Sequence, residues 1–350
     1  MGCCRYPFER LNIEWDGNVT FCCPAFTHDY LLGNIFKDSV EDLLYGEKAV
    51  EFRKSVYNNT YKYCDLKYCF EYRDYNIKEF EEKFVDRPLY PKVVHLSYVK
   101  ACNVRCMTCR DDLIVETKEN IENFNKIIDK VMDICRDAEI VYLNGSGEVF
   151  VSSHLKSLIK KISDKYPNIK FMIVSNGLLF NEKHVKEFGF DGKIWKVGLS
   201  IHGATKKTYE RIVRGGHWEQ LHKNLKYISK LKKKGEIREL DFNFVFHSLN
   251  FKEMPKFVKM ANKYGANAYF SRFRKWGDSS VMCSNYEKYT CWEPNHPDYK
   301  EFIKVLRKLK GMKGYKLAED YFIKLQSRLK ETFIMKIKYF IIGLFKKKKS

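Results

Sequence analysis

The chain has 350 residues, enough for one large domain with a smaller one beside it, and 45% of them are hydrophobic, which excludes an intrinsically disordered protein. Its formal net charge of +20 favours an anionic partner, such as RNA, a nucleotide-linked or pyrophosphate-linked substrate or an anionic membrane surface, although scattered lysines are also typical of an ordinary solvated surface. The 12 cysteines occur in clustered groups and no apolar secretory segment opens the chain, so we expect metal ligation in the reducing cytoplasm instead of disulfides.

The first 85 residues predict a small cysteine-rich domain. Apolar residues alternate with polar ones over 11–15 and again over 19–21, and the turn sequence Asp16-Gly17-Asn18 lies between these stretches. This pattern is typical of a β-hairpin. The hairpin would bring Cys4 and Cys22, which flank it, to one end of the domain.

The cysteine spacing of this segment resembles the SPASM or twitch modules that hold auxiliary iron–sulfur clusters. Those modules begin with the pattern C-x9–15-G-x4-C, which Cys4, Gly17 and Cys22 reproduce. The resemblance implies one auxiliary [4Fe–4S] cluster, although such modules normally follow a core domain and this one precedes it. Its ligands would be Cys4, Cys22, Cys64 and Cys69, with Cys3 and Cys23 as neighbours able to replace them. A structural four-cysteine zinc site is the alternative, because thiolate count and spacing do not choose the metal.

Strand-like and helix-like stretches alternate regularly from about residue 90 to 275, which indicates repeated β-α units and a parallel sheet. Apolar residues recur at helical spacing between the strands, as in Leu155, Leu158, Ile159 and Ile162. This periodicity alone does not separate a doubly wound sheet from a barrel. The expected strands are 93–98, 139–143, 169–174, 195–200, 240–246 and 268–273.

Three cysteines, Cys102, Cys106 and Cys109, follow the first of these strands in the pattern C-x3-C-x2-C. Thiolates this close together in the chain can wrap one metal ion or one cluster. A structural zinc site requires a fourth ligand, and the next cysteine, Cys135, lies on the apolar stripe of a predicted helix, where a core position is expected. An iron–sulfur cube held by three cysteines instead keeps one iron open for a cofactor or substrate. A zinc knuckle is the alternative.

The triplet after a first strand resembles the radical S-adenosylmethionine (radical SAM) enzymes. The resemblance implies a [4Fe–4S] cluster on Cys102, Cys106 and Cys109, whose open iron chelates S-adenosylmethionine, and it selects the partial (β/α)6 barrel of that family. In these enzymes the reduced cluster cleaves S-adenosylmethionine to methionine and a 5'-deoxyadenosyl radical, which takes a hydrogen atom from a substrate C–H bond. Thr108 stands where the family usually has an aromatic residue, a departure that affects one adenine contact and not the cluster.

Polar and glycine residues follow the C-terminal ends of the predicted strands, where α/β folds place their sites. Gly145-Ser146-Gly147-Glu148 is similar to the family's GGE motif, so Glu148 and the backbone at Gly145 and Gly147 would bind the amino group of S-adenosylmethionine. Ser175 and Asn176 resemble part of a Thr-Asn-Gly motif whose side chains lie near the ribose or the substrate, with an ordinary turn as the alternative.

The run from Leu199 to Gly216 is similar to one found in SPASM-containing members of the family. By this resemblance Ser200 and one of Arg211 and Arg214 would hold the cofactor carboxylate, since a guanidinium suits bidentate pairing. Arginines on a surface helix are the alternative. His202 stands where the family has an aspartate, and it either transfers a proton near the substrate or has a structural role.

The C-terminal segment, residues 277–350, predicts helices and a basic tail. Cys283 and Cys291 either cap a cluster or are buried, and a helix after Pro297 carries one apolar face. The stretch Phe333–Phe345 is too short and too charged to span a bilayer, and lysines 346–349 follow it. We expect an interfacial helix at the inner face of the membrane, with packing against the barrel as the alternative.

Together these features predict an α/β protein in which a partial (β/α)6 TIM-like barrel is preceded by a small auxiliary-cluster domain. We expect that domain over residues 1–85, a radical SAM core over 88–276 and a helical segment over 277–350. The expected activity is the oxidation or modification of a glycan-linked or other anionic small molecule. Alternatives are a peptide- or protein-modifying maturase, an RNA modifier, or a zinc-stabilised α/β binding protein without enzyme activity. A flavodoxin- or ferredoxin-type reductant would be a partner, whereas nucleic acid is not expected because no separate RNA-binding domain is evident.

Overall fold

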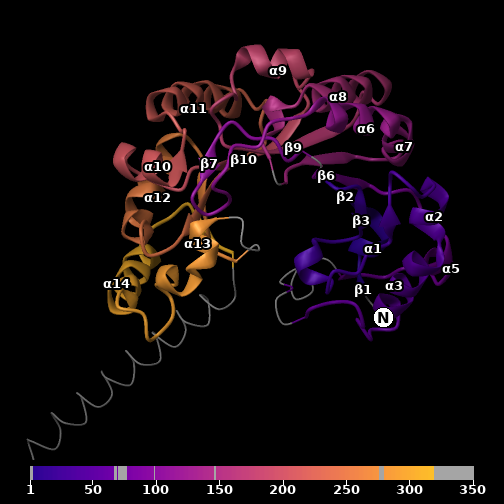
Figure 1. Ribbon diagram of the computed structural model, residues 1–350, viewed down its shortest axis with the longest axis horizontal. Coiled ribbons are helices and arrows are strands. Elements are labelled where there is room, and N and C mark those ends of the chain that lie inside the picture. The colour runs from indigo at the N-terminus through magenta and orange to yellow at the C-terminus, as the bar shows by residue number, and fades with distance from the viewer. Residues whose placement is uncertain are drawn as a thin grey trace, which may run out of the picture.

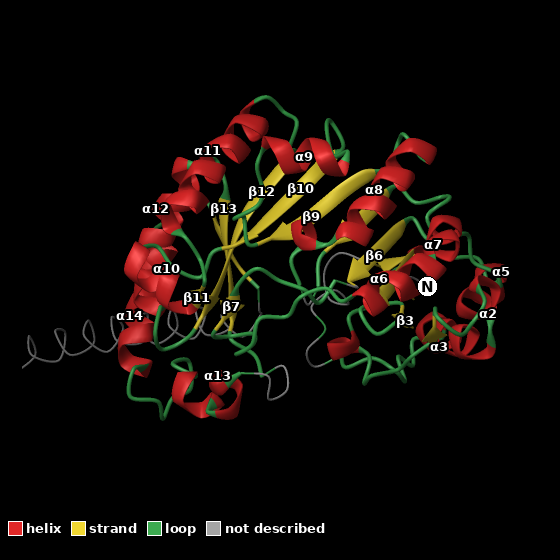
Figure 2. Cartoon of the chain, turned by 45° about the horizontal axis from the view of Figure 1, so that its top comes forward, coloured by secondary structure: helices red, strands yellow, loops and turns green. Residues whose placement is uncertain are grey.

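One large sheet dominates the computed structural model, which describes residues 3–66, 69, 77–97, 99–145, 147–275 and 280–318. Its strand order is β14-β13-β12-β10-β9-β8-β6-β2-β3-β4. The sheet curves into an open crescent with most of the helices on its outer side (Figures 1 and 2).

The elements have the following bounds in chain order. The strands are β1 (Cys3–Cys4), β2 (Arg10–Glu14), β3 (Asn18–Thr20), β4 (Gly33–Asn34), β5 (Ile77–Lys78), β6 (Val93–Ser97), β7 (Arg105–Cys106), β8 (Ile140–Leu143), β9 (Lys170–Ser175), β10 (Ile194–Ser200), β11 (Val213–Arg214), β12 (Glu239–Phe246), β13 (Asn267–Arg272) and β14 (Tyr315–Leu317). The helices are α1 (Tyr6–Glu9), α2 (Val40–Tyr45), α3 (Glu47–Tyr57), α5 (Lys83–Asp86), α6 (Lys118–Lys126), α7 (Ile128–Ile134), α8 (Ser153–Lys165), α9 (Glu182–Phe188), α10 (Lys206–Ile212), α11 (Trp218–Lys233), α12 (Met254–Lys263), α13 (Val281–Ser284) and α14 (Tyr299–Lys310).

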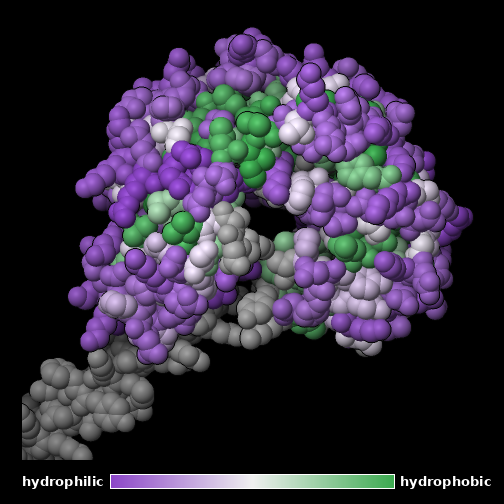
Figure 3. All heavy atoms as spheres, viewed as in Figure 1, coloured by the Kyte–Doolittle hydropathy of each residue, from purple (hydrophilic) through white to green (hydrophobic). Residues whose placement is uncertain are grey.

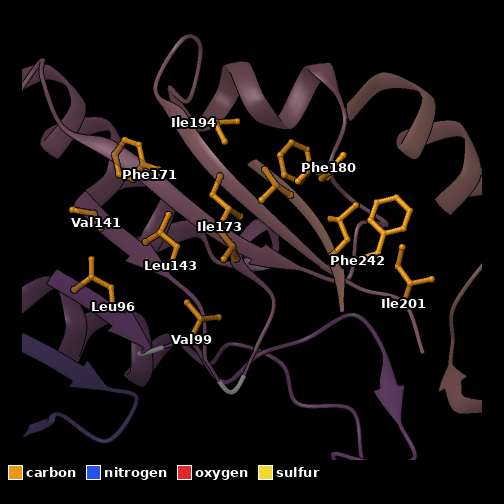
Figure 4. Close-up of a cluster of buried hydrophobic side chains, with 14 of the residues drawn as sticks. Leu96, Val99, Val141, Leu143, Phe171, Ile173, Phe180, Ile194, Ile201 and Phe242 are labelled. Carbon is orange, nitrogen blue, oxygen red and sulfur yellow. The ribbon is translucent and has the colours of Figure 1, made fainter. Parts of the chain in front are cut away.

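The central strands β6, β8, β9, β10, β12 and β13 pair in parallel, each with its neighbour. Apolar residues at every second position of these strands pack under the outer helices, including Leu96, Val141, Leu143, Phe171 and Ile173 (Figure 4). The sheet ends at β14 on one side and β4 on the other, so it does not close into a complete barrel. The predicted α/β fold with a partial barrel is confirmed.

The opposite, concave face of the sheet carries polar side chains. Successive strand residues point to opposite faces, so the neighbours of the core residues lie on this side. Asn12, His95 and Tyr142 are aligned there across β2, β6 and β8. The space-filling view shows a hollow at the centre of the molecule, and the surface of this view is mostly hydrophilic (Figure 3).

The predicted N-terminal hairpin forms, and it joins the core sheet. β2 and β3 pair antiparallel around the turn at Gly17, whose φ of 81° favours glycine. β2 also pairs in parallel with β6, with Leu11 opposite Val94, and both of these side chains are fully buried. The cysteine-rich segment and the core therefore share one continuous sheet.

The predicted helix whose apolar stripe ends at Cys135 is divided into α6 and α7. Ile127 between them departs from helical geometry, with φ of −105° and ψ of 1°. Cys135 follows α7 and is fully buried, and burial raises the pKa of its thiol to about 12. Cys283 and Cys291 also lie in the hydrophobic core, in which α14 buries its apolar face.

The predicted interfacial helix Phe333–Phe345 and the lysines 346–349 lie outside the described residues, as does Ser146 of the glycine motif. Within the described ranges, none of the helices combines the length and the apolar character that crossing a bilayer requires.

Candidate functional site

The cysteine loop begins after β6, and contacts from distant segments hold it in place. The Cys102 N–H donates to the Ile114 carbonyl at 2.9 Å, and the N–H groups of Cys109 and Arg110 both donate to the Cys106 carbonyl, at 2.9 and 3.0 Å. β7, which contains Cys106, pairs antiparallel with β11 after α10. The loop is therefore clamped between its own turn and the chain that follows β10.

The thiols of Cys102, Cys106 and Cys109 lie close enough to influence one another. Burial raises the pKa of Cys106, and the charges of Cys102 and Cys109 raise it further. Three thiolates in such a place need cations to compensate their charge. No three histidine, cysteine, aspartate or glutamate side chains in the described ranges are placed to hold a single metal ion. An iron–sulfur cluster does not require that arrangement, because each cysteine binds a different iron, so this donor set fits a cluster.

Glu148 is buried beside the cysteine loop, with each carboxylate oxygen engaged. Oε1 accepts from the Ser175 hydroxyl at 2.7 Å, and Oε2 accepts from the Asn176 N–H at 2.7 Å. Burial raises the pKa of Glu148 to about 7 despite these hydrogen bonds. The Asn176 amide also donates to the Asn103 side chain at 2.8 Å and lies 3.9 Å from the Cys102 sulfur. The structure thus brings together the predicted residues Glu148, Ser175 and Asn176, and a buried carboxylate here fits the ammonium group of S-adenosylmethionine.

The glycines of the predicted GGE-like motif allow close backbone approach to the cysteine loop. A Cβ at Gly147 would collide with the carbonyls of Val99 and Ala101, and one at Gly145, where φ is 139°, would collide with Ser97. The loop between β8 and Glu148 can therefore pack on the start of the cysteine loop only with glycine at these positions.

Ser200, Arg211 and Arg214 are placed differently from one another. Ser200 is partly buried at the C-terminal end of β10, and Arg211 is exposed on α10. Arg214 donates to the carbonyls of Arg105 and Arg110, at 2.9 and 2.7 Å. It also pairs with Asp111 at 2.7 Å. Arg214 thus braces the cysteine loop, and binding of the cofactor carboxylate by either arginine stays a prediction.

His202 is buried directly after β10. Its Nδ1 accepts from the Val245 N–H at 3.1 Å, and its carbonyl accepts from the Asn250 side chain at 3.0 Å. Burial lowers the pKa of His202 to about 4, so the ring is neutral at pH 7. These contacts favour the structural alternative, and the proton-transfer role stays a prediction.

A cavity in the N-terminal domain, here called the auxiliary cavity, has about 380 Å³ of empty volume, part of it open to solvent. Cys4, Cys22, Cys64 and Cys69 all line it, together with mainly apolar and aromatic side chains. Burial raises the pKa of Cys64 to about 12, with Cys4 and Cys69 adding to the effect. Four thiols line a mostly apolar cavity, and their thiolate charges would repel one another without bound cations, so this donor set fits an auxiliary cluster. Cys3 is buried in the hydrophobic core, and Cys23 is not among the lining residues.

The arrangement of the auxiliary cavity predicts different effects for neighbouring cysteines. Cys22→Ala should remove about half of the bound iron, because it deletes a cavity thiol, while cleavage of S-adenosylmethionine without substrate continues at the separate cysteine loop. Cys23→Ala is the matched control and should keep the iron content of the wild type. Iron and sulfide analysis of anaerobically purified protein checks both. Equal iron loss in the two variants would contradict this assignment.

Hydrogen bonds that sequence analysis missed run across the polar face of the sheet, from Arg10 on β2 through His95 on β6 to Asn144 after β8. Nη2 of Arg10 lies 2.9 Å from Nδ1 of His95. Burial raises the pKa of Cys22, and the charge of Arg10 opposes this rise. Nε2 of His95 lies 2.7 Å from the Asn144 side chain, directly before Gly145. Burial and Arg10 lower the pKa of His95 to about 3, so it is neutral. The signal in the sequence was the polar residues between apolar ones in two strands, Arg10 and Asn12 in β2 and His95 in β6.

Glu116 anchors the chain that leaves the cysteine loop. It pairs with His154 at 2.8 Å and accepts from the backbone and hydroxyl of Ser153 at the start of α8. Burial raises the pKa of Glu116, but hydrogen bonds from His154, Ser152 and Ser153 outweigh burial and hold this pKa at about 2. The return of the loop to the sheet therefore depends on an ionised carboxylate.

Glu116→Gln should reduce the free energy of unfolding by about 1–3 kcal/mol at pH 7, because a partly buried charged acceptor is lost. A carboxyl whose pKa falls on folding stabilises above its usual pKa of 4.5, and this stabilisation is lost as the pH falls toward 2. The stability difference between wild type and Glu116→Gln should therefore shrink below pH 4.5. Denaturant titrations at several pH values measure it, with the exposed Glu119→Gln as control. A difference independent of pH would contradict the prediction.

Comparisons with known proteins identify both parts of the chain. The Radical SAM superfamily profile matches residues 96–261, and the SPASM profile, described as an iron-sulfur cluster-binding domain, matches residues 3–70. The FeMo cofactor biosynthesis protein NifB of Methanocaldococcus jannaschii is 25% identical over 137 residues, which cover 36% of this chain and 45% of that protein. The chain thus matches less than half the length of this curated relative.

Solved structures with similarity include TYW1 with a lysine-pyruvate adduct bound, at a TM-score of 0.37 and 17% identity over 63% of this chain and 71% of that one. Another is the cobalamin-dependent S-adenosylmethionine radical enzyme OxsB, with a TM-score of 0.33 and 16% identity; the match covers 68% of this chain and 36% of that one. The family assignment rests on the two profiles and the curated relative. They imply an enzyme that uses S-adenosylmethionine, a [4Fe–4S] cluster and an auxiliary iron–sulfur cluster. The chain belongs to the radical SAM superfamily and carries a SPASM-type iron–sulfur domain at its N-terminus.

Proposed function

We propose that this radical SAM enzyme abstracts a hydrogen atom from a C–H bond of an anionic small molecule or a glycan-linked substrate, which is thereby oxidised or modified. The supporting observation is the polar concave face between the cysteine loop and the auxiliary cavity. Arg10 and Asn12 lie there on β2, beside His95 on β6. A substrate with acidic or hydroxyl groups would supply oxygen acceptors for this face.

The charge of the chain adds to the case for an anionic substrate. Its net charge of +20 attracts an acidic substrate to the surface.

The residues of the site have separate roles in this proposal. Cys102, Cys106 and Cys109 would hold the cluster, whose reduced form supplies the electron that cleaves S-adenosylmethionine so that a 5'-deoxyadenosyl radical takes the substrate hydrogen. Glu148 would pair with the ammonium group of S-adenosylmethionine and orient it. Cys4, Cys22, Cys64 and Cys69 would hold the auxiliary cluster near the concave face, and a flavodoxin- or ferredoxin-type protein would deliver electrons.

Deuterium transfer tests the substrate class. Anaerobic enzyme with dithionite is incubated with S-adenosylmethionine and a panel of deuterated sugar phosphates, nucleotide-linked sugars and peptides, and 5'-deoxyadenosine is analysed by mass spectrometry. We expect deuterium from an acidic sugar compound. Deuterium from peptides alone would identify a peptide maturase and refute the proposed substrate class.

Arg10→Gln should raise the KM for the substrate that transfers deuterium at least tenfold, because a charge-assisted contact is worth about 1.5–3 kcal/mol. The exposed Arg87 forms a surface pair with Glu41, so Arg87→Gln is a control of equal charge change. An equal effect of the two variants would show that only the overall charge matters.

A further inference from the structure

Arg110, directly after the third cysteine of the loop, directs its guanidinium at the Cys109 sulfur. Its Nε and Nη2 each lie 3.3 Å from that sulfur. Its Nη1 donates to the Lys100 carbonyl at 2.7 Å, which fixes the plane of the group. The side chain is only 7% exposed, although Cys109 itself is exposed. A rigid planar fork can present two N–H groups to one acceptor in this way, which a lysine cannot do.

The sulfur of Cys109 thus has a different environment from that of Cys102. The Cys102 sulfur has neutral contacts, from the Asn176 amide at 3.9 Å and from the backbone of Val104. The positive charge of Arg110 is therefore directed at the Cys109 sulfur.

Reduction adds one electron to a cluster without breaking a bond. Hydrogen bonds to the cysteine sulfurs and the net charge nearby set the reduction potential of such a cluster. A buried cation with two N–H groups at one sulfur stabilises the more negative, reduced state. The potential should consequently be higher with Arg110 than without it, so that a cellular reductant can supply the electron more readily.

We propose that Arg110 is a positioning residue that raises the reduction potential of the [4Fe–4S] cluster on Cys102, Cys106 and Cys109. The proposal rests on that ligand assignment but not on the identity of the substrate. The group acts through the Cys109 sulfur and does not touch the reacting atoms.

The test is a redox titration of the full chain with both clusters, monitored by electron paramagnetic resonance without substrate. The signal that changes on addition of S-adenosylmethionine identifies the cluster with an open iron. Arg110→Gln should make reduction at least tenfold less favourable at a given potential, a shift of about 59 mV for one electron. Arg110→Lys keeps the charge but not the fork, and should recover part of the shift.

Arg105 provides the matched control, because it is exposed in the same loop one residue before Cys106. Arg105→Gln removes the same charge and should shift the potential by less than half as much. Equal shifts in Arg110→Gln and Arg105→Gln, or no shift in Arg110→Gln, would overturn the proposal. If Arg110→Gln binds no cluster, the reduction potential of Arg110→Lys is measured instead. A wild-type potential in Arg110→Lys would overturn the proposal. Wild-type protein without iron at the loop would refute the ligand assignment itself, whereas failure to find a sugar substrate would leave this result unaffected.

Discussion

Replacing Cys106 with alanine should abolish the dithionite-driven cleavage of S-adenosylmethionine and remove the iron of one cluster. Cys106 is the centre of the loop, since its carbonyl accepts the N–H groups of Cys109 and Arg110 and its strand β7 pairs with β11. Two thiolates cannot replace three in holding a cluster with one open iron. We expect cleavage below detection, with iron and sulfide reduced to about one cluster. Quantification of iron, sulfide, zinc, methionine and 5'-deoxyadenosine measures this.

A suitable control for Cys106→Ala is Cys135→Ala. Cys135 is a fully buried cysteine of the core at the end of α7, away from the loop. Its replacement should leave iron content and cleavage unchanged while costing some stability through lost packing. Zinc without iron in the wild type, or cleavage that survives Cys106→Ala, would refute the radical site and favour a zinc-stabilised α/β protein.

Glu148→Gln should weaken the binding of S-adenosylmethionine about 10- to 150-fold. The change removes the charge that would pair with the ammonium group, a contact worth about 1.5–3 kcal/mol. In the wild type the Ser175 hydroxyl and the Asn176 N–H donate to the two carboxylate oxygens. The glutamine would place its amide N–H against one of these two donors. Calorimetry under anaerobic conditions measures the affinity, and the exposed Glu182→Gln is the control. An unchanged affinity in Glu148→Gln would show that the ammonium binds elsewhere.

The pH dependence of stability gives a second measurement on Glu148. Its pKa is raised on folding from a usual value of 4.5 to about 7, so the folded protein binds more protons than the unfolded one between these values. The contribution of this residue to stability therefore falls by about 3 kcal/mol as the pH rises from 4.5 to 7 and stays constant above. Glu148→Gln should not show this fall in stability between pH 4.5 and 7. Denaturant titrations of the cluster-free wild type and variant at several pH values measure the difference. The opposite slope would contradict burial of the carboxyl.

The strands of the core were predictable because their apolar residues have a clear pattern. The expected strand 195–200 is β10 (Ile194–Ser200), and the expected strand 240–246 is β12 (Glu239–Phe246). The division between α6 and α7 was not predictable, because the apolar stripe continues across Ile127, and Phe124 and Val131 on either side are both buried. Periodicity reports which face is buried and does not report where the backbone leaves helical geometry.

The sequence by itself determined the family and the class of chemistry, and it predicts the cysteine ligands, because cysteine and glycine spacing are local properties of the chain. Only the tertiary structure decided which of two adjacent cysteines faces the auxiliary cavity. Cys3 and Cys4 lie opposite Lys78 and Ile77 in a two-stranded ladder, so their side chains point to opposite faces, and Cys4 lines the cavity while Cys3 enters the core. The partners of Arg214 and Arg110, the chain from Arg10 to Asn144 and the shared sheet of β2 and β6 likewise join segments far apart in the sequence, and no local pattern encodes such contacts.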